Sequence, residues 1–121
     1  MQAKAFATEP FSLPIGEVTV SAVLSLDQSH NIWDVIVVLA RTPGEDFIKG
    51  EEVDAQLLDR RNKALKVLER PSEPLVEAGG SLSVSANARF RFQGSKAVPA
   101  HLVVTYQDQT VRFRVVQSRE G

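Results

Sequence analysis

Polar and apolar side chains alternate without a break from Ser81 to Phe92. A period of two residues is the pattern of a β-strand that has one face in the core and the other in water. The segment therefore predicts a strand with buried phenylalanines and solvated arginines. The apolar row holds Leu82, Val84, Ala86, Ala88, Phe90 and Phe92, and the polar row holds Ser81, Ser83, Ser85, Asn87, Arg89 and Arg91.

The same period recurs in other segments. Residues 16–27 place Val18, Val20, Ala22, Leu24 and Leu26 on one face. Residues 100–106 and 110–116 alternate as well, and the polar residues 107–109 between them predict a hairpin. The apolar segment 2–13 contains Pro10, which suits an edge strand or a lead-in, because proline removes a donor from the ladder.

Residues 32–42 are apolar on both faces. One row holds Trp33, Val35, Val37 and Leu39, and the other holds Ile32, Ile36, Val38 and Ala40. A strand of this kind is typical of the centre of a sheet that is covered on both sides. The alternative is that one of the two rows is an exposed patch that a partner or a second copy covers.

Residues 51–70 fit two structures. Val53, Leu57, Leu58, Leu65 and Leu68 follow a helical stripe, with acidic residues at its start and basic residues at its end. The segment also fits two short strands, 53–59 and 63–69, around the polar turn 60–62. We favour the two strands because the segments around them are β.

These elements predict a single domain, residues 1–121, with an all-β fold. Six to eight strands at short spacing indicate an antiparallel β-sandwich, immunoglobulin-like in architecture. The alternative is a β-sandwich or small barrel with one helix at 51–70. Trp33 in the third expected strand is similar to the tryptophan of immunoglobulin-like sandwiches, and the likeness is one of architecture alone.

Strand pairing can also be proposed. In immunoglobulin-like sandwiches the second and fifth strands often lie side by side, which here pairs the 16–26 strand with the 81–90 strand. The register that joins their buried rows places Ser21 opposite Ser85 and Glu17 opposite Arg89.

Composition excludes several classes of site. The chain has no cysteine, so disulfides, thiolate metal sites and a cysteine nucleophile are excluded. No stretch reaches the ~18 apolar residues that span a membrane, and the first residues lack the apolar core of a signal peptide. We expect a soluble domain, cytoplasmic or exported with its signal removed, without a cofactor.

The net charge of −1 hides an uneven distribution. Residues 1–59 sum to −7 and residues 60–121 sum to +6. Such a split can mark a basic patch for an anionic partner. We favour the alternative that the fold interleaves the two halves, so that opposite charges become neighbours.

The outward arginines are the first candidates for interaction. Arg89 and Arg91 alternate with phenylalanines on one strand, and Arg112 and Arg114 flank Phe113 on another. If the two strands were neighbours, four guanidinium groups would form one patch for phosphate, sulfate or carboxylate. We favour solvated faces with cross-strand ion pairs. Nucleic acid is not an expected partner, since no aromatic side chain is expected on these faces.

The remaining candidates are apolar, acidic or imidazole groups. Ile36 and Val38 are the apolar interaction candidates. Asp34, alone in an apolar strand, is expected to accept hydrogen bonds from the backbone or an arginine. His30 and His101 lack the spacing of a zinc site. The weak candidates for a calcium site, which we disfavour against a solvated acidic loop, are Glu45, Asp46, Glu51, Glu52 and Asp54.

No pair of groups makes a clear acid–base couple. The sequence therefore predicts a non-enzymatic module that binds a protein partner or associates with itself. The alternative is a small-ligand or carbohydrate-binding domain that uses the outer Ser/Thr/Arg face, and a hydrolase built around Asp34 or the acids of residues 45–54 ranks last.

Overall fold

The computed structural model describes residues 3–41, 53–71, 78–79, 84–94 and 98–117. Within this described part the chain forms strands and turns but no helix. The strands are β1 (Ala3–Glu9), β2 (Ser12–Ile15), β3 (Val18–Asp27), β4 (Ile32–Arg41), β5 (Val53–Asp59), β6 (Val67–Glu69), β7 (Ala78–Gly79), β8 (Val84–Gln93), β9 (Pro99–Tyr106) and β10 (Gln109–Gln117).

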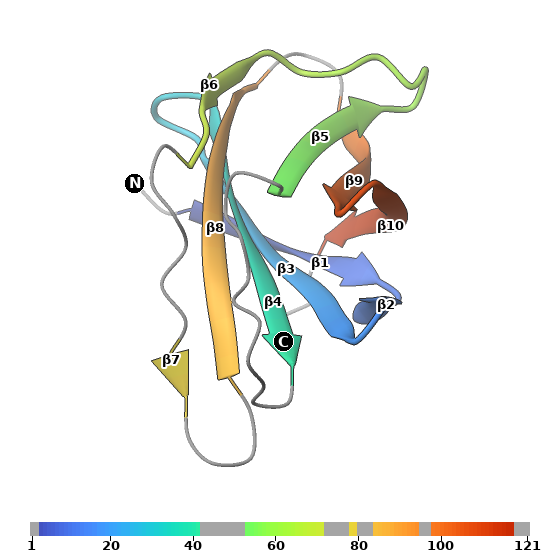
Figure 1. The fold of residues 1–121 in the computed structure, drawn as a ribbon. Helices are drawn as coiled ribbons and strands as arrows, with labels where there is room; N and C mark the ends of the chain where they lie inside the picture. The colour runs from blue at the N-terminus through green and yellow to red at the C-terminus, as the bar shows by residue number, and fades with distance from the viewer. Residues whose placement is uncertain (1–2, 42–52, 72–77, 80–83, 95–97, 118–121) are drawn as a thin grey trace.

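All the described strand pairs are antiparallel, and they belong to one sheet that curls into a nearly closed barrel (Figure 1). The strand order is β5-β9-β10-β1-β3-β4-β8-β6, while β2 pairs with β3 and β7 pairs with β8. The prediction of an all-β antiparallel fold is confirmed. The finer prediction, an immunoglobulin-like sandwich, stays a prediction.

The segment 53–69 is two strands around a turn, as the sequence favoured, and the alternative helix at 51–70 is wrong for the described residues 53–70. β5 ends at Asp59, whose Oδ1 accepts the backbone N–H groups of Arg61 (2.8 Å) and Lys63 (3.0 Å). Asn62 then has a positive φ of 61°, a conformation that asparagine tolerates better than most residues. The chain therefore reverses instead of continuing as a helix.

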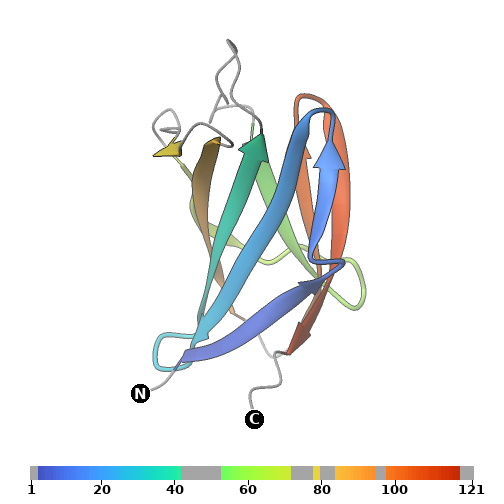
Figure 2. The ribbon, with the colours of Figure 1, turned by 90° about the horizontal axis from the view of Figure 1, so that it is seen from below.

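The residues after this turn join the two ends of the strand path. The N–H of Leu65 donates to the carbonyl of Leu57 on β5, and the N–H of Gln93 on β8 donates to the carbonyl of Lys66, both at 2.9 Å. β6 then pairs with β8. Figure 2 shows this light-green segment running from the end of β5 across to β8.

β4 lies between β3 and β8 and pairs with both along its full length. The predicted register of β3 against β8 is therefore wrong. Val37 lies opposite Ala22 on one side and Ala88 on the other. The doubly apolar pattern of β4 did predict a central strand, and a central strand must have a neighbour on each side.

The inward rows form the core as the alternation predicted. Phe90 and Phe92 on β8 are fully buried, with ring centroids 6.4 Å apart. Trp33 on β4 packs edge-on against Phe6 on β1 at 4.7 Å. Along β4 the four residues of the Trp33 row are all buried, whereas the Ile36 row is half-buried. Leu82 lies outside the described residues.

The hairpin predicted near the end of the chain is confirmed. β9 and β10 pair with Tyr106 opposite Gln109 and Leu102 opposite Phe113. β1 is not an edge strand, because it pairs with β10 on one side and β3 on the other. No helix long and apolar enough to cross a membrane occurs in the part of the chain described above.

Candidate functional site

The four candidate arginines lie on two strands that are not neighbours. Arg89 and Arg91 are on β8, and Arg112 and Arg114 are on β10. Three strands, β1, β3 and β4, separate β8 from β10 in the sheet. A single patch of four guanidinium groups is therefore not formed.

Arg89 is held by Asp34 across the β4–β8 pair. Its Nε donates to Oδ1 of Asp34 at 2.9 Å and its Nη2 donates to Oδ2 at 2.6 Å. This two-point geometry matches the planar guanidinium to the carboxylate. The hydrogen bonds from Arg89 lower the pKa of Asp34, while partial burial opposes the shift. Of the two donors predicted for Asp34, the backbone or an arginine, the structure shows the arginine.

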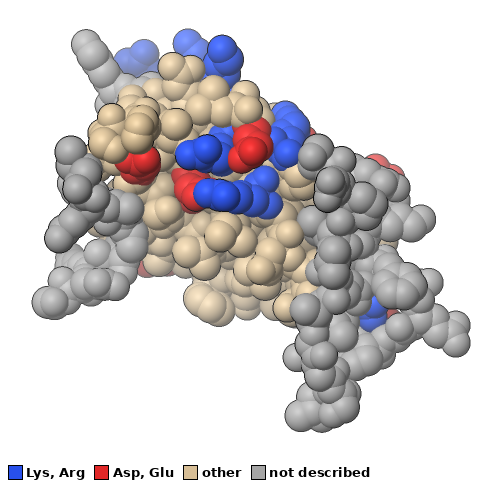
Figure 3. All heavy atoms as spheres, turned by 90° about the vertical axis from the view of Figure 1, so that its left-hand side faces the viewer, with Lys and Arg blue, Asp and Glu red and all other residues tan. Residues whose placement is uncertain are grey.

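Arg91 lies in a row of charges on the same side of the sheet. It stands opposite Asp34 on β4 and Glu69 on β6. Its Nε is buried and has no hydrogen-bond partner among the described residues. Figure 3 shows acidic and basic side chains gathered in the middle of this side of the molecule, with uncharged surface around them.

The arginines of β10 bind neighbours of their own. Nη2 of Arg112 donates to Oδ1 of Asn62 at 2.6 Å, and Nη2 of Arg114 pairs with Glu9 on β1. Neither guanidinium is therefore a free anion site.

The fold brings some acids of the first half of the sequence beside arginines of the second half. The described ion pairs of arginine are Asp34 with Arg89, Glu9 with Arg114, and Asp54 with Arg70. Each joins an acid of the first half to a base of the second half. This supports the interleaved interpretation over one large basic face.

The apolar candidates lie on the solvent side of β3, β4 and β8, which we call the outer face. Ile36 and Val38 point outward on β4 and are half-buried. Val23 on β3 lies directly opposite Ile36 and is 59% exposed. Together with Ala40 they form an apolar strip. Asp34 and the arginines of β8 border it at one end, and serine, threonine and asparagine side chains flank the rest.

Only one of the five calcium candidates lies among the described residues. Asp54 pairs with Arg70, and Glu45, Asp46, Glu51 and Glu52 lie outside the described residues. The described residues contain no group of three or more metal-ligating side chains.

The two histidines lie in different settings. His30 Nδ1 lies 2.9 Å from Oδ2 of Asp27 in the β3–β4 turn. His101 on β9 has a buried Nδ1 without a hydrogen-bond partner in the described part of the chain. The hydroxyl of Ser29 also lies 3.1 Å from Nδ1 of His30. Serine and aspartate therefore meet the same ring nitrogen, whereas a hydrolase triad places them on the two different nitrogens of the imidazole.

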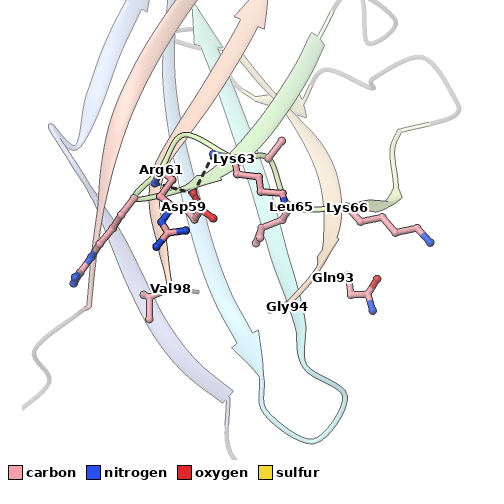
Figure 4. Close-up of a pocket in the computed structure, with 10 residues that line it drawn as sticks. Asp59, Arg61, Lys63, Leu65, Lys66, Gln93, Gly94 and Val98 are labelled. Carbon is pink, nitrogen blue, oxygen red and sulfur yellow. Dashed lines mark hydrogen bonds between the residues drawn. The ribbon is translucent and has the colours of Figure 1, made fainter. Parts of the chain in front are cut away.

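A hollow that the sequence analysis did not find lies beside the turn after β5. It has a volume of about 860 Å³ and we call it the basic groove (Figure 4). The basic run Arg60-Arg61-Asn62-Lys63 is visible in the sequence and forms one wall of the groove. The opposite wall comes from residues that are distant in the sequence. The lining is Asp59, Arg60, Arg61, Lys63, Ala64, Leu65, Lys66, Gln93, Gly94 and Val98.

In comparisons with known proteins, no family model, curated protein or solved structure matches the chain.

Proposed function

We propose that this domain is a non-enzymatic interaction module that associates with a second copy through its outer face. The observation that carries the proposal is the exposed valine Val23 lying against the half-buried Ile36 and Val38 in the middle of a sheet face. An apolar centre with a polar border is the usual composition of a protein interface. The apolar strip stands beside charged groups at one end only.

The charges of the outer face favour a second copy as the partner. Asp34 and Glu69 supply negative charge on either side of Arg91. Arg89, two residues before Arg91 on β8, adds a second positive charge. In a two-fold dimer the same face meets itself, so acids and bases of the two copies are both present in the interface. A partner whose surface carried charges of a single sign would be repelled by half of these groups.

The expected association is weak. Three strands and five outward rows cover about 15 Å by 30 Å, or roughly 450 Å² per copy, from ordinary strand spacing and rise. A stable interface buries ~800 Å² per partner, so we expect a reversible dimer at high concentration.

Binding rather than catalysis fits the state of the titratable groups on this face. Asp34, the carboxylate nearest the apolar strip, keeps a lowered pKa because Arg89 donates two hydrogen bonds to it. A general base acts best with a pKa near the working pH. A carboxylate needs a raised pKa for that role, whereas the pKa of Asp34 is lowered.

Light scattering on size-exclusion fractions, or sedimentation equilibrium, tests the proposal over a series of concentrations. The average mass is expected to rise with concentration and to stay at the monomer value in Val23→Lys. Val98→Lys is the matched control, because Val98 is also 59% exposed but lies in the basic groove. A strict monomer at every concentration overturns the proposal. Equal loss of dimer formation in both variants overturns it as well.

A second candidate function is carbohydrate binding on the polar part of the same face. Ser12 on β2 lies opposite Ser21 on one side of the apolar strip, and Ser85 and Asn87 lie on β8 on its other side. Aligned hydroxyl and amide groups can bind a sugar. A glycan array tests this, with a hit that disappears in Arg91→Ala as the supporting result and no hit as the contrary one.

We also propose the immunoglobulin-like architecture predicted from the sequence. Trp33, 3% exposed in the middle of the sheet, supports it. A crystal structure tests it, since two separately bonded sheets packed at about −30° are the expected result. A closed barrel is the contrary one.

A further inference from the structure

The basic groove lies where the turn after β5 approaches the end of β8. Figure 4 shows the turn with Asp59, Arg61 and Lys63 on one side, and Gln93, Gly94 and Val98 on the other. Its volume, about 860 Å³, is within the range of pockets that hold small molecules. Size alone therefore admits an organic ligand.

The charge in this groove is not neutralised. Its lining contains four cationic side chains, Arg60, Arg61, Lys63 and Lys66, and one carboxylate, Asp59. Among the residues that the structure describes, no acidic side chain forms an ion pair with any of the four. This contrasts with Arg89 and the arginines of β10, which are bound by neighbouring side chains.

The single carboxylate is committed to the backbone. Asp59 is 8% exposed, and its Oδ1 accepts the N–H groups of Arg61 and Lys63. Two backbone hydrogen bonds at 3.0 Å, between Asp59 and Lys63 and between Asn62 and Asp59, hold the same turn. The acid therefore fixes the turn and leaves its cationic side chains available to a ligand.

The opposite wall is fixed as well. Gly94 donates its N–H to the carbonyl of Asn31 at 2.7 Å, and Gln93 donates to the carbonyl of Lys66. A Cβ at Gly94 would lie 2.8 Å from that Asn31 oxygen, closer than real side-chain atoms approach, so the backbone here requires glycine. A preformed site loses less free energy on ordering when a ligand binds.

From these observations we propose that the basic groove binds a small phosphorylated molecule. The phosphate oxygens accept hydrogen bonds from Arg61 and Lys63, because arginine and lysine are the usual cationic partners of phosphate. Leu65, Ala64 and the exposed Val98 supply an apolar surface for the organic part of the ligand.

A phosphorylated small molecule fits better than a nucleic acid. Sequence-independent binding of single strands relies on aromatic side chains on which bases stack, and the described lining contains none. The four cations lie within one short segment, residues 60–66, and do not extend as a stripe along the sheet. The groove therefore matches a compact anion rather than a long one.

The test is an NMR titration of the ¹⁵N-labelled full chain at low salt with three probes. ATP and inorganic tripolyphosphate are expected to shift the amides of Arg61, Lys63 and Gly94, and adenosine is not. Tighter binding of ATP than of tripolyphosphate supports the proposal of an organic phosphate. Equal or weaker binding of ATP contradicts the contact between the apolar lining and the organic part of the ligand.

Paired variants separate a site from general charge attraction. Arg61→Gln with Lys63→Gln is expected to raise the Kd for ATP about tenfold or more, from the loss of charge-assisted hydrogen bonds. Arg89→Gln with Arg114→Gln removes the same charge from other faces and is expected to leave the Kd unchanged. The spectrum of each variant shows directly whether it is folded.

Three further outcomes overturn the proposal. The first is the absence of shifts at the groove amides with any probe. The second is equal weakening in both paired variants, which indicates nonspecific attraction. The third is a single-stranded oligonucleotide that binds more tightly than ATP with a steep dependence on salt, which indicates a nucleic-acid surface. None of these outcomes bears on the outer face.

Discussion

Thr8 is a polar side chain on the inner side of β1. It is 6% exposed, and its Oγ1 is buried with no hydrogen-bond partner among the described residues. A buried hydroxyl without a partner has lost its hydrogen bonds to water and gained nothing in return. Valine has nearly the same shape without the polar atom.

We therefore predict that Thr8→Val stabilises the protein. The expected gain in the free energy of unfolding is about 1–2 kcal/mol, measured by urea denaturation. Thr19→Val, the same change at an exposed position of β3, is the control and should change stability by less than ~0.5 kcal/mol. A loss of stability in Thr8→Val would show that the hydroxyl is bonded in solution.

Asp27 fixes the turn between β3 and β4. Its Oδ1 accepts the backbone N–H of Ser29 at 3.0 Å and the Ser29 hydroxyl at 2.7 Å. The Ser29 hydroxyl, followed by His30, lowers the pKa of Asp27 from 3.8 to about 2. Because folding depresses this pKa, ionised Asp27 stabilises the fold above pH 3.8, and the contribution is lost as the pH falls through about 2.

An NMR titration of the side-chain carboxyl carbons measures this directly. The Asp27 midpoint is expected near 2, and Ser29→Ala is expected to raise it toward 3.8. Ser25→Ala, on the same strand but without a hydrogen bond to Asp27, should leave the midpoint unchanged. A wild-type midpoint at 3.8 would contradict the turn geometry.

At this scale the sequence predicts the chemistry of a contact better than its partner. The pattern around Asp34 predicts hydrogen bonds from the backbone or an arginine, and Arg89 supplies them. Arg89, however, was expected opposite Glu17 on the next strand. The alternation shows that Arg89 is outward, but the identity of its neighbour depends on strand order, which alternation does not contain.

The turn between β9 and β10 is the clearest case at the scale of one element. Gln107 and Asp108 both have positive φ, 51° and 63°. Two such residues form the tight hairpin turn that asparagine followed by glycine favours. Side chains other than glycine disfavour this conformation, so the native turn holds some strain.

We expect Asp108→Gly to raise the free energy of unfolding by about 0.5–1 kcal/mol, because glycine adopts positive φ without strain. Gln109→Gly, one position further and already in β10, is expected to lower stability by a similar amount. Thermal unfolding followed by circular dichroism compares the two. Equal effects of the same sign would contradict this turn type.

Two other turns share a pattern that the sequence does reveal. Each begins with an aspartate, Asp27 or Asp59, that accepts the N–H two residues later, and each contains an asparagine, Asn31 or Asn62, at positive φ. This pattern explains why the turn at residues 60–62 could be predicted from the sequence. The basic groove could not, because Gly94 and Val98 reach it only through the pairing of distant strands.

For the whole molecule, the sequence indicates which side of each strand is buried but not which strands are neighbours. The core rows of β4, β8, β9 and β10 follow from periodicity. Periodicity does not predict the path of the segment between β5 and β8. This path depends on the backbone hydrogen bonds donated by Leu65 and Gln93.

Both proposed surfaces depend on the same feature of the fold, the position of β4 between β3 and β8. That order assembles the apolar strip with its charged border, and it places the end of β8 beside the β3–β4 turn, where Gly94 donates to Asn31. A sheet with β3 beside β8 would separate Ile36 from Arg89 and break up the outer face.

Cross-strand nuclear Overhauser effects test this order most directly. Backbone contacts are expected from Val37 to Ala22 on one side and from Val37 to Ala88 on the other, as the two registers require. Direct backbone contacts between Ser21 and Ser85, with none between Val37 and Ala88, would place β3 beside β8 and contradict the account.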